Sequence, residues 1–143
     1  MDVPIDVIGP CGFPYSLRAM KRQLMDYGNL ADVTHHDSWS RFQQDRPAGR
    51  LIAMTTKAAT PLWQFRFQAD DTILMGQESA GLPEEVHNLA DARLVIPMAP
   101  NTRSLNIAVS AGMAVAEAIR QLRYPGNHRS VPAAIPMDQQ ASN

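Results

Sequence analysis

Cysteine is almost absent from this chain of 143 residues, which contains only Cys11. A single cysteine excludes an internal disulfide framework and a zinc site built from several cysteines. No histidine lies close to Cys11 in the sequence, so we expect a small buried or turn residue there rather than a nucleophile. The cysteine count is typical of a protein of the reducing cytosol.

An excess of charge of one sign is missing as well. The 13 lysine and arginine residues nearly balance the 14 aspartate and glutamate residues, which gives a formal net charge of −1. This balance gives no global signal for nucleic-acid binding. Hydrophobic residues make up 45% of the chain and charged residues 19%, an ordinary globular composition that argues against wholesale disorder. The length suits one domain.

Long hydrophobic runs are also lacking. The longest apolar stretch, 105–119, is interrupted by Asn106, Ser110 and Glu117, so it does not predict a membrane span. The first four residues carry no basic region followed by an apolar stretch, so no signal peptide is predicted. These absences together predict a cytoplasmic protein.

Short apolar runs alternate with amphipathic stretches along the chain. The predicted strands are Val3–Ile8, Ala31–Thr34, Leu51–Thr55, Thr72–Gly76 and Arg93–Ile96. The predicted helices are Tyr15–Tyr27, Trp39–Asp45, a segment opened by Pro83-Glu84-Glu85, and Ser104–Arg123. Strands separated by helices indicate an α/β fold, with a mostly parallel sheet covered by helices on both faces. We expect one domain over residues 1–124 and a disordered, proline-containing tail over 125–143.

The loop after Gly76 invites two enzymatic interpretations. Gly76 and Gly81 have the spacing of a phosphate-binding loop, but Leu82-Pro83 replaces the Lys-Ser/Thr pair, so an ATPase is disfavoured. Ser79 lies between a strand and a helix, as the nucleophile of an α/β hydrolase does. The first glycine of that motif is missing, and only His87 and His128 follow. A hydrolase using Ser79 stays a weak alternative.

Two polar clusters are equally open to ordinary interpretations. The run His35-His36-Asp37 would point its side chains in different directions, so we expect an exposed polar loop and no metal site. The cations at 18, 21 and 22 share one face of a predicted helix. They form either a solvated face or a patch that contacts phosphates.

The last predicted helix is apolar nearly all the way round. Large apolar side chains such as Val109, Met113 and Ile119 alternate with many small ones, including Ala114. A helix of this kind must be covered on more than one side. A chain of 143 residues has little material to do so near its C-terminus. The pattern therefore predicts homodimerisation through this helix.

Three blocks, taken in order, resemble the knotted SPOUT-class RNA 2′-O-methyltransferases. They are Met54-Thr55-Thr56-Lys57, then Gly76-Gln77-Glu78-Ser79-Ala80-Gly81-Leu82-Pro83, and then Ile96-Pro97-Met98 with Arg103-Ser104-Leu105-Asn106. Within that family the chain is most similar to the tRNA (cytidine/uridine-2′-O)-methyltransferases that act on the wobble nucleotide. The resemblance extends from about Val3 to Gly126.

The resemblance implies a C-terminal trefoil knot that holds S-adenosylmethionine, a homodimer formed through the knot region, and tRNA as the partner. No metal is implied. The residues matched to the cofactor pocket are Met54, Gly76, Ile96, Ser104 and Leu105. The residues matched to catalytic positions are Glu78 and Asn106. The residues expected to contact tRNA are Arg18, Lys21, Arg22 and Arg103.

One departure from the family concerns the start of the chain. Members of the family begin with a further strand, a loop and a helix that carries an arginine thought to aid catalysis. The first strand of this sequence, Val3–Ile8, corresponds to the family's second strand. The sequence therefore predicts an S-adenosylmethionine-dependent tRNA 2′-O-methyltransferase, or a truncated copy of one. The alternative is an inactive RNA-binding and dimerisation module of the same fold. A missing central strand would leave unpaired edges on its neighbours, so we expect low stability or aggregation.

Overall fold

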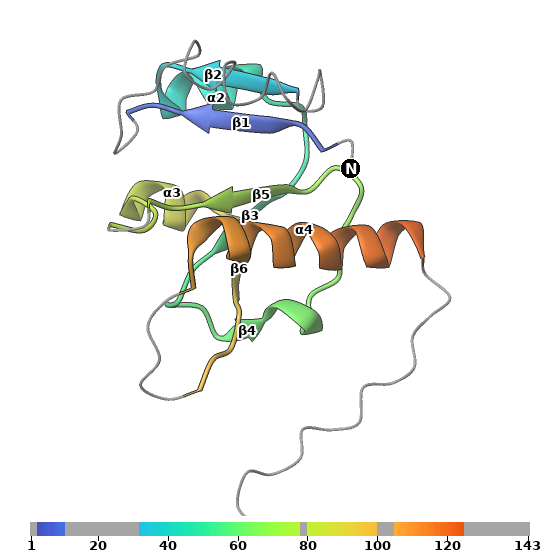
Figure 1. Cartoon of the computed structure of the whole chain (residues 1–143). Coiled ribbons are helices and arrows are strands. Elements are labelled where there is room, and N and C mark those ends of the chain that lie inside the picture. Colours follow the sequence, from blue (N-terminus) through green and yellow to red (C-terminus); the bar gives the residue numbers. More distant parts are fainter. Residues whose placement is uncertain (1–2, 11–31, 78–79, 100–104, 125–143) are drawn as a thin grey trace, which may run out of the picture.

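The computed structural model describes residues 3–10, 32–77, 80–99 and 105–124. Strands and helices alternate along these segments (Figure 1). The strands are β1 (Ile5–Ile8), β2 (Val33–His36), β3 (Leu51–Met54), β4 (Thr60–Pro61), β5 (Thr72–Met75) and β6 (Ala92–Val95). The helices are α2 (Trp39–Asp45), α3 (Glu84–Leu89) and α4 (Ile107–Arg123), with a short 3-10 helix, η2 (Leu62–Gln64). The predicted helix over Tyr15–Tyr27 and the predicted tail over 125–143 lie outside the described residues.

Every strand pair in the described segments is parallel, which confirms the α/β fold with parallel sheets. One sheet has four strands in the order β4-β6-β3-β5, and a second sheet pairs β1 with β2. Parallel strands of one sheet need crossover connections, and helix α3 lies in the one from β5 to β6. Helix α2 connects β2 of the smaller sheet to β3 of the larger one. The boundaries that the sequence predicts for these strands and helices agree with the structure to within three residues.

Strand β3 lies at the centre of the larger sheet and is buried along its whole length. Successive side chains of a strand point to opposite faces of the sheet. Accordingly, Ile52 and Met54 belong to one hydrophobic cluster, and Leu51 belongs to another. The continuous apolar sequence of β3 therefore reflects a sheet that is covered on both sides.

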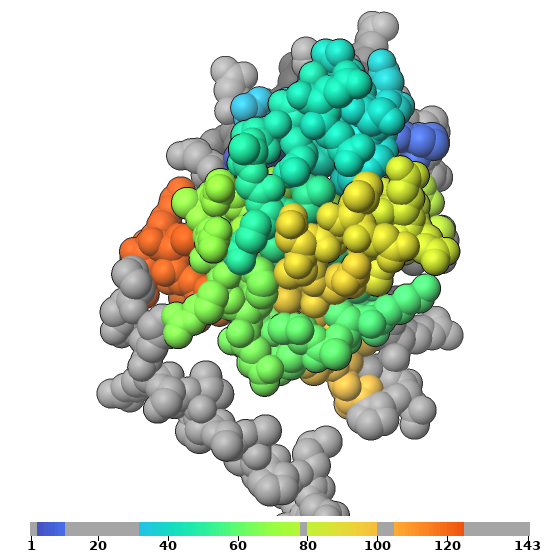
Figure 2. Space-filling model, turned by 180° about the vertical axis from the view of Figure 1, so that it is seen from behind, coloured from blue at the N-terminus to red at the C-terminus, as the bar shows by residue number. Residues whose placement is uncertain are grey.

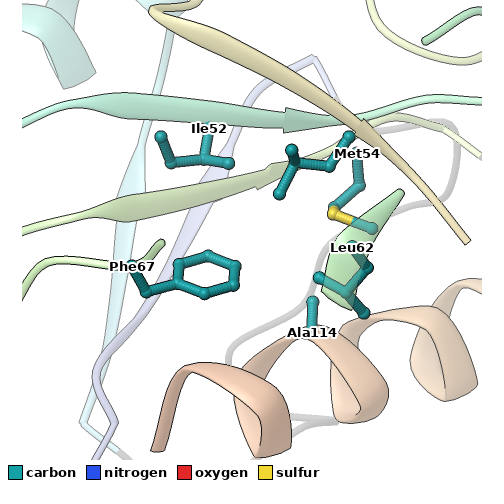
Figure 3. Close-up of a cluster of buried hydrophobic side chains, with 6 residues drawn as sticks. Ile52, Met54, Leu62, Phe67 and Ala114 are labelled. Carbon is teal, nitrogen blue, oxygen red and sulfur yellow. The ribbon is translucent and has the colours of Figure 1, made fainter. Parts of the chain in front are cut away.

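Helix α4 covers the face of the sheet onto which Ile52 and Met54 point (Figure 3). Ala114 is fully buried against Leu62 and Phe67, so a small residue lets the helix come close to the sheet. The opposite face is covered by α2 and α3, whose Phe42 and Val86 pack in a second cluster with Leu51 and Leu74.

Two polar networks fasten the segment after η2 to its surroundings. Arg50 forms a double hydrogen bond of 2.7 Å with the buried carboxylate of Asp71, and its guanidinium lies 5.0 Å from the ring centre of Phe65. The bond to Asp71 raises the pKa of Arg50 above its ordinary value. Gln121 of α4 bonds to the backbone of Phe65 and Phe67. The segment is therefore held from both the sheet and α4.

The run of two histidines and an aspartate was expected as an exposed polar loop, and for His36 this expectation is wrong. His36 ends β2 and is only 4% exposed. Its Nε2 lies 2.8 Å from Asp6 Oδ1 on β1, and its Nδ1 lies 3.5 Å from Asp45 Oδ2 on α2. The imidazole ring also packs against Phe42 in a T-shaped arrangement. His36 thus links β1, β2 and α2, because a buried polar ring needs partners on the elements around it.

Strand β4 and helix η2 were not predicted from the sequence. β4 consists of Thr60 and Pro61, which pair with Leu94 and Val95 of β6. Proline lacks a backbone N–H and usually argues against a strand. It is accepted here because β4 is an edge strand of two residues.

β1 and β5 each have one strand neighbour among the described residues. The smaller sheet lies on the β5 side of the larger one (Figure 1). Ile8 of β1 packs on the cluster that includes Leu74 of β5, and Gln77 Nε2 donates to the carbonyl oxygen of Pro10 at 3.3 Å. The two sheets therefore join through side chains near the ends of β1 and β5.

Within the described part of the chain, no helix combines the length and the apolar character that crossing a membrane requires.

Candidate functional site

The carboxyl ends of three neighbouring strands lie at the same level of the sheet. Met54, the last residue of β3, is paired with Met75 of β5 and with Leu94 of β6. The loops that follow β3, β5 and β6 therefore leave the sheet along one edge. This edge is where open parallel sheets bind ligands.

Helix α4 begins on the same side of the molecule (Figure 1). Three apolar side chains that the sequence assigns to the cofactor pocket come from this region. Met54 and Ile96 both belong to the cluster on the α4 face, Met54 as a buried member and Ile96 as a partly buried one. Leu105, two residues before α4, is 36% exposed. Apolar side chains from three segments thus lie beside the carboxyl edge, with Met54 buried and Ile96 and Leu105 accessible in part.

Gly76 stands at the start of the loop after β5, and the loop explains why a glycine is needed. A Cβ on Gly76 would lie 2.3 Å from both the carbonyl carbon of Gly81 and the backbone nitrogen of Leu82. Gln77 and Gly81 exchange two backbone hydrogen bonds of 3.0 and 2.7 Å, which close the loop. Gly81 has a φ of 71°, a conformation that favours glycine. Backbone contacts within the loop therefore fix its conformation and require glycine at position 76.

A second tight turn follows β3. The backbone N–H of Lys57 donates to Thr55 Oγ1 at 3.2 Å, and the N–H of Ala58 donates to the carbonyl oxygen of Thr55 at 3.4 Å. Threonine side chains stabilise turns in this way. Neither the role of Thr55 in this turn nor the hydrogen bond between Gln77 and Pro10 was predicted from the sequence. A threonine two residues before Lys57 was a usable signal, whereas the contact to Pro10 is not encoded locally.

Asn106 caps the N-terminus of α4. Its Oδ1 accepts a hydrogen bond of 2.9 Å from the backbone N–H of Ala108. No acidic side chain lies in the first turn of α4, so the positive end of the helix dipole is not offset by a carboxylate of its own turn. Asn106 therefore has a structural role as the cap of α4, in addition to the catalytic role that the sequence resemblance assigns to it.

The remaining residues predicted for the site lie outside the described residues. They are Glu78 and Ser104, the four cations Arg18, Lys21, Arg22 and Arg103, and the serine of the hydrolase alternative, Ser79. Met54, Gly76, Ile96, Leu105 and Asn106 are described, and each belongs to a segment at the carboxyl edge of the sheet or to the start of α4. In the segments that the structure describes, no group of His, Cys, Asp and Glu side chains could hold a metal ion.

Comparisons with known proteins agree with this geometry. The model of the SpoU rRNA Methylase family matches residues 3–116. A tRNA (cytidine(34)-2′-O)-methyltransferase of Beijerinckia indica is 46% identical over 124 residues, which are 85% of this chain and 78% of the relative. The match is to methylases, so it does not favour the hydrolase alternative.

Solved structures show the same relationship. A structure described as giving insights into the 2-OH methylation of C/U34 on tRNA has a TM-score of 0.74 and 41% identity, over 84% of this chain and 79% of the other. An AdoMet-bound rRNA methyltransferase from Sinorhizobium meliloti has a TM-score of 0.68 and 27% identity, over 83% of this chain and 46% of the other. The resemblance carried by the three sequence blocks is thereby confirmed, and the chain belongs to the SpoU rRNA Methylase family.

Proposed function

We propose that this chain transfers a methyl group from S-adenosylmethionine to the ribose 2′-hydroxyl of the wobble nucleotide, cytidine or uridine, in tRNA. One observation carries the proposal. The ends of β3, β5 and β6 meet the start of α4 at one edge, in a chain 46% identical to a tRNA (cytidine(34)-2′-O)-methyltransferase. The three blocks that resemble the family begin at the ends of these strands, at Met54, Gly76 and Ile96.

S-adenosylmethionine fits the residues at this edge. An adenosine group needs apolar surface and a few backbone hydrogen-bonding groups. Met54, Ile96 and Leu105 supply the apolar side chains, and the turns at Thr55 and Gly76 present backbone. The residues that would hold the cofactor are Met54, Gly76, Ile96, Ser104 and Leu105. The bound cofactor supplies an electrophilic methyl group.

Two polar residues are assigned to the ribose hydroxyl. The reaction requires that the hydroxyl oxygen be held in line and that its proton be removed. Asn106 Oδ1 is occupied by the helix cap, so the side-chain amide can donate through Nδ2 to the hydroxyl oxygen. Glu78, two residues after Gly76, supplies a carboxylate as the proton acceptor.

The proposal includes a wider assembly. The C-terminal part of the fold forms a trefoil knot, and two chains associate through α4, whose Val109 and Met113 are exposed. The cytoplasm is the compartment in which this enzyme meets tRNA. The cations that contact the tRNA backbone are Arg18, Lys21, Arg22 and Arg103. Arginine and lysine suit this role because phosphate contacts position an RNA.

Methyl transfer to defined tRNAs tests the proposal. The full chain is incubated with labelled S-adenosylmethionine and unmodified tRNA carrying cytidine or uridine at position 34, and the product is digested and analysed by mass spectrometry. We expect a 2′-O-methylated nucleotide at position 34 and none in a tRNA with a purine there. Cofactor binding without methyl transfer would instead support the alternative of an inactive RNA-binding and dimerisation module.

A matched pair of variants tests the assignment of Asn106. Asn106→Asp keeps an oxygen that can cap α4 but removes the amide donor, whereas Asn106→Ala removes both. We expect both variants to lose methyl transfer and only Asn106→Ala to lose stability. An Asn106→Asp variant with full activity would contradict the role of Asn106 as a donor.

A further inference from the structure

A cavity of about 440 Å³ lies on the edge of the larger sheet. It adjoins the turn at Thr55, but none of the five residues assigned to the cofactor lines it. One side is the segment Lys57–Thr60, which connects β3 to β4. The other sides are formed by Phe65, by Ala92–Leu94 of β6 and by Asp91, which precedes that strand. Figure 2 shows β6, in gold, beside the green segment that follows β3. A volume of this size falls in the usual range for small-molecule sites.

The strand edge inside this cavity has backbone available for a ligand. β4 pairs only with Leu94 and Val95, so Ala92 and Arg93 have no strand on that side within the described residues. Alternate residues of a parallel strand direct their N–H and C=O groups to opposite neighbours. Of Ala92 and Arg93, only one therefore directs its backbone groups into the cavity, because the other directs them to β3. That residue can bond the edge of a planar ligand.

An aromatic ring borders the same cavity and is fixed in place. Phe65 has the guanidinium of Arg50 5.0 Å from its ring centre and meets Phe67 in a T-shaped contact at 5.0 Å. Its backbone carbonyl accepts from Gln121 at 2.9 Å. An aromatic ring that is already immobilised costs little entropy when a nucleobase stacks on it.

Two cations on the cavity have no ion-pair partner among the described residues. Lys57 is exposed. Arg93 is positioned by its Nε, which donates to the carbonyl oxygen of His87 at 2.9 Å and lies 3.2 Å from His87 Nδ1. The nearby carboxylate of Asp91 accepts from the backbone N–H of Leu51 at 2.7 Å. Arg93 alternates along β6 with Ala92 and Leu94, which pack in the same cluster as Phe65, so its side chain lies on the α3 face of the sheet. Lys57 is therefore the cation offered to a phosphate, and the carboxylate of Asp91 is already bonded.

We propose that this cavity binds a nucleotide, with the base against Phe65 and the edge of β6 and the phosphate at Lys57. The three features match the three parts of that ligand. Bases stack on aromatic rings, backbone groups form hydrogen bonds with the edges of bases, and cations bind phosphate. The ligand is either a free nucleotide or a nucleotide of the RNA substrate that lies outside the reacting position.

Calorimetric titration of the full chain with cytidine monophosphate tests the proposal. Saturating S-adenosylhomocysteine is included so that the cofactor position cannot take up the probe. We expect binding of cytidine monophosphate, weaker binding of cytidine, and loss of affinity of about fivefold or more in Phe65→Leu, since base stacking is worth about 1–3 kcal/mol. Lys57→Gln should weaken cytidine monophosphate but leave cytidine unchanged.

Arg66→Gln is the matched control. It removes one positive charge, as Lys57→Gln does, and Arg66 is exposed and does not line the cavity. Thermal unfolding of each variant verifies that the fold is kept. If the natural ligand is part of the RNA, Lys57→Gln also weakens tRNA binding and lowers its salt dependence. If it is a free nucleotide, tRNA binding stays unchanged.

The proposal is overturned if the unaltered chain binds neither cytidine monophosphate nor cytidine while Lys57→Gln and Phe65→Leu bind tRNA as Arg66→Gln does. Binding of S-adenosylhomocysteine and methyl transfer are measured on the same preparation. Failure of the nucleotide site is therefore distinguishable from failure of the proposed methyl transfer.

Discussion

Gly76 and Gly81 lie so close together that a Cβ added to Gly76 would fall 2.3 Å from the carbonyl carbon of Gly81. This contact belongs to the loop after β5, which the two backbone bonds between Gln77 and Gly81 close. The loop cannot relax by a small side-chain movement, because the atoms that a methyl group would meet are backbone atoms.

The first prediction is that Gly76→Ala reshapes this loop and weakens the binding of S-adenosylmethionine. We expect a loss of at least about tenfold, equivalent to about 1.4 kcal/mol, measured by calorimetry. The strands β3 and β5 do not depend on this contact, so urea unfolding should show a folded variant. Unchanged affinity would contradict the assignment of this loop to the cofactor.

Gly112→Ala is the matched control for that variant. A Cβ on Gly112, in the middle of α4, would meet nothing within 4 Å. Alanine is a better helix former than glycine, so the substitution should raise the free energy of unfolding by about 0.5–1 kcal/mol. It should leave cofactor binding unchanged.

The second prediction concerns Gln121, which fastens α4 to the segment after η2. Its Oε1 accepts from the N–H of Phe67 at 3.0 Å, and its Nε2 donates to the carbonyl oxygen of Phe65 at 2.9 Å. Gln121→Leu leaves both backbone groups without this partner. We expect the free energy of unfolding to fall by about 1–3 kcal/mol in urea denaturation, the cost of partly buried polar groups that lose their bonds.

Gln64→Leu serves as the comparison, because Gln64 is exposed at the end of η2. Its free energy of unfolding should change by less than about 0.5 kcal/mol. Equal losses in the two variants would indicate that removing a surface amide, rather than the bonds from α4, causes the effect.

The sequence predicts the layered α/β fold because the relevant signals are local. The apolar runs at Leu51–Met54 and Thr72–Met75 are too short and too continuous for amphipathic helices. Ser38 is a residue type that favours a helix N-cap, and its hydroxyl accepts from the backbone N–H of Arg41 at the start of α2. The carboxyl edge could also be predicted, since any parallel sheet gathers the ends of its strands.

Other features depend on contacts between distant residues. His36 can be buried because its ring has polar partners on other elements: Asp6 of β1 is hydrogen-bonded to Nε2, and Asp45 of α2 lies 3.5 Å from Nδ1. Strand β4 contains Pro61 and forms only because Leu94 and Val95 are alongside it. The resemblance assigns Gly76 to the cofactor pocket, whereas the structure shows that its own loop requires a glycine.

The third prediction is that α4 mediates dimerisation. Val109 and Met113 are four residues apart, so they share one face of the helix, and they are 52% and 41% exposed. If this face is an interface, Met113→Glu should shift the mass measured by light scattering from dimer to monomer. Leu89→Glu, which alters an exposed apolar residue of α3, should leave the mass unchanged. A monomeric unaltered chain would contradict the interface.

The last prediction concerns the edges of β1 and β5, which have no second strand neighbour within the described residues. Unpaired edges of this kind promote association of one chain with another through strand pairing. Ile5, which is 50% exposed on β1, adds an apolar side chain to that edge. Ile5→Lys should therefore reduce the concentration-dependent increase in light scattering, because a lysine on an edge strand opposes pairing with the strand of another chain.

Trp63→Lys separates this effect from a general loss of exposed apolar surface, since Trp63 is exposed on η2 and does not belong to a strand edge. Only Ile5→Lys should suppress the concentration-dependent scattering if strand pairing is the cause. The same suppression in both variants would show that the association is driven by exposed apolar side chains in general. In that case strand pairing at the edge of β1 would play no part in it.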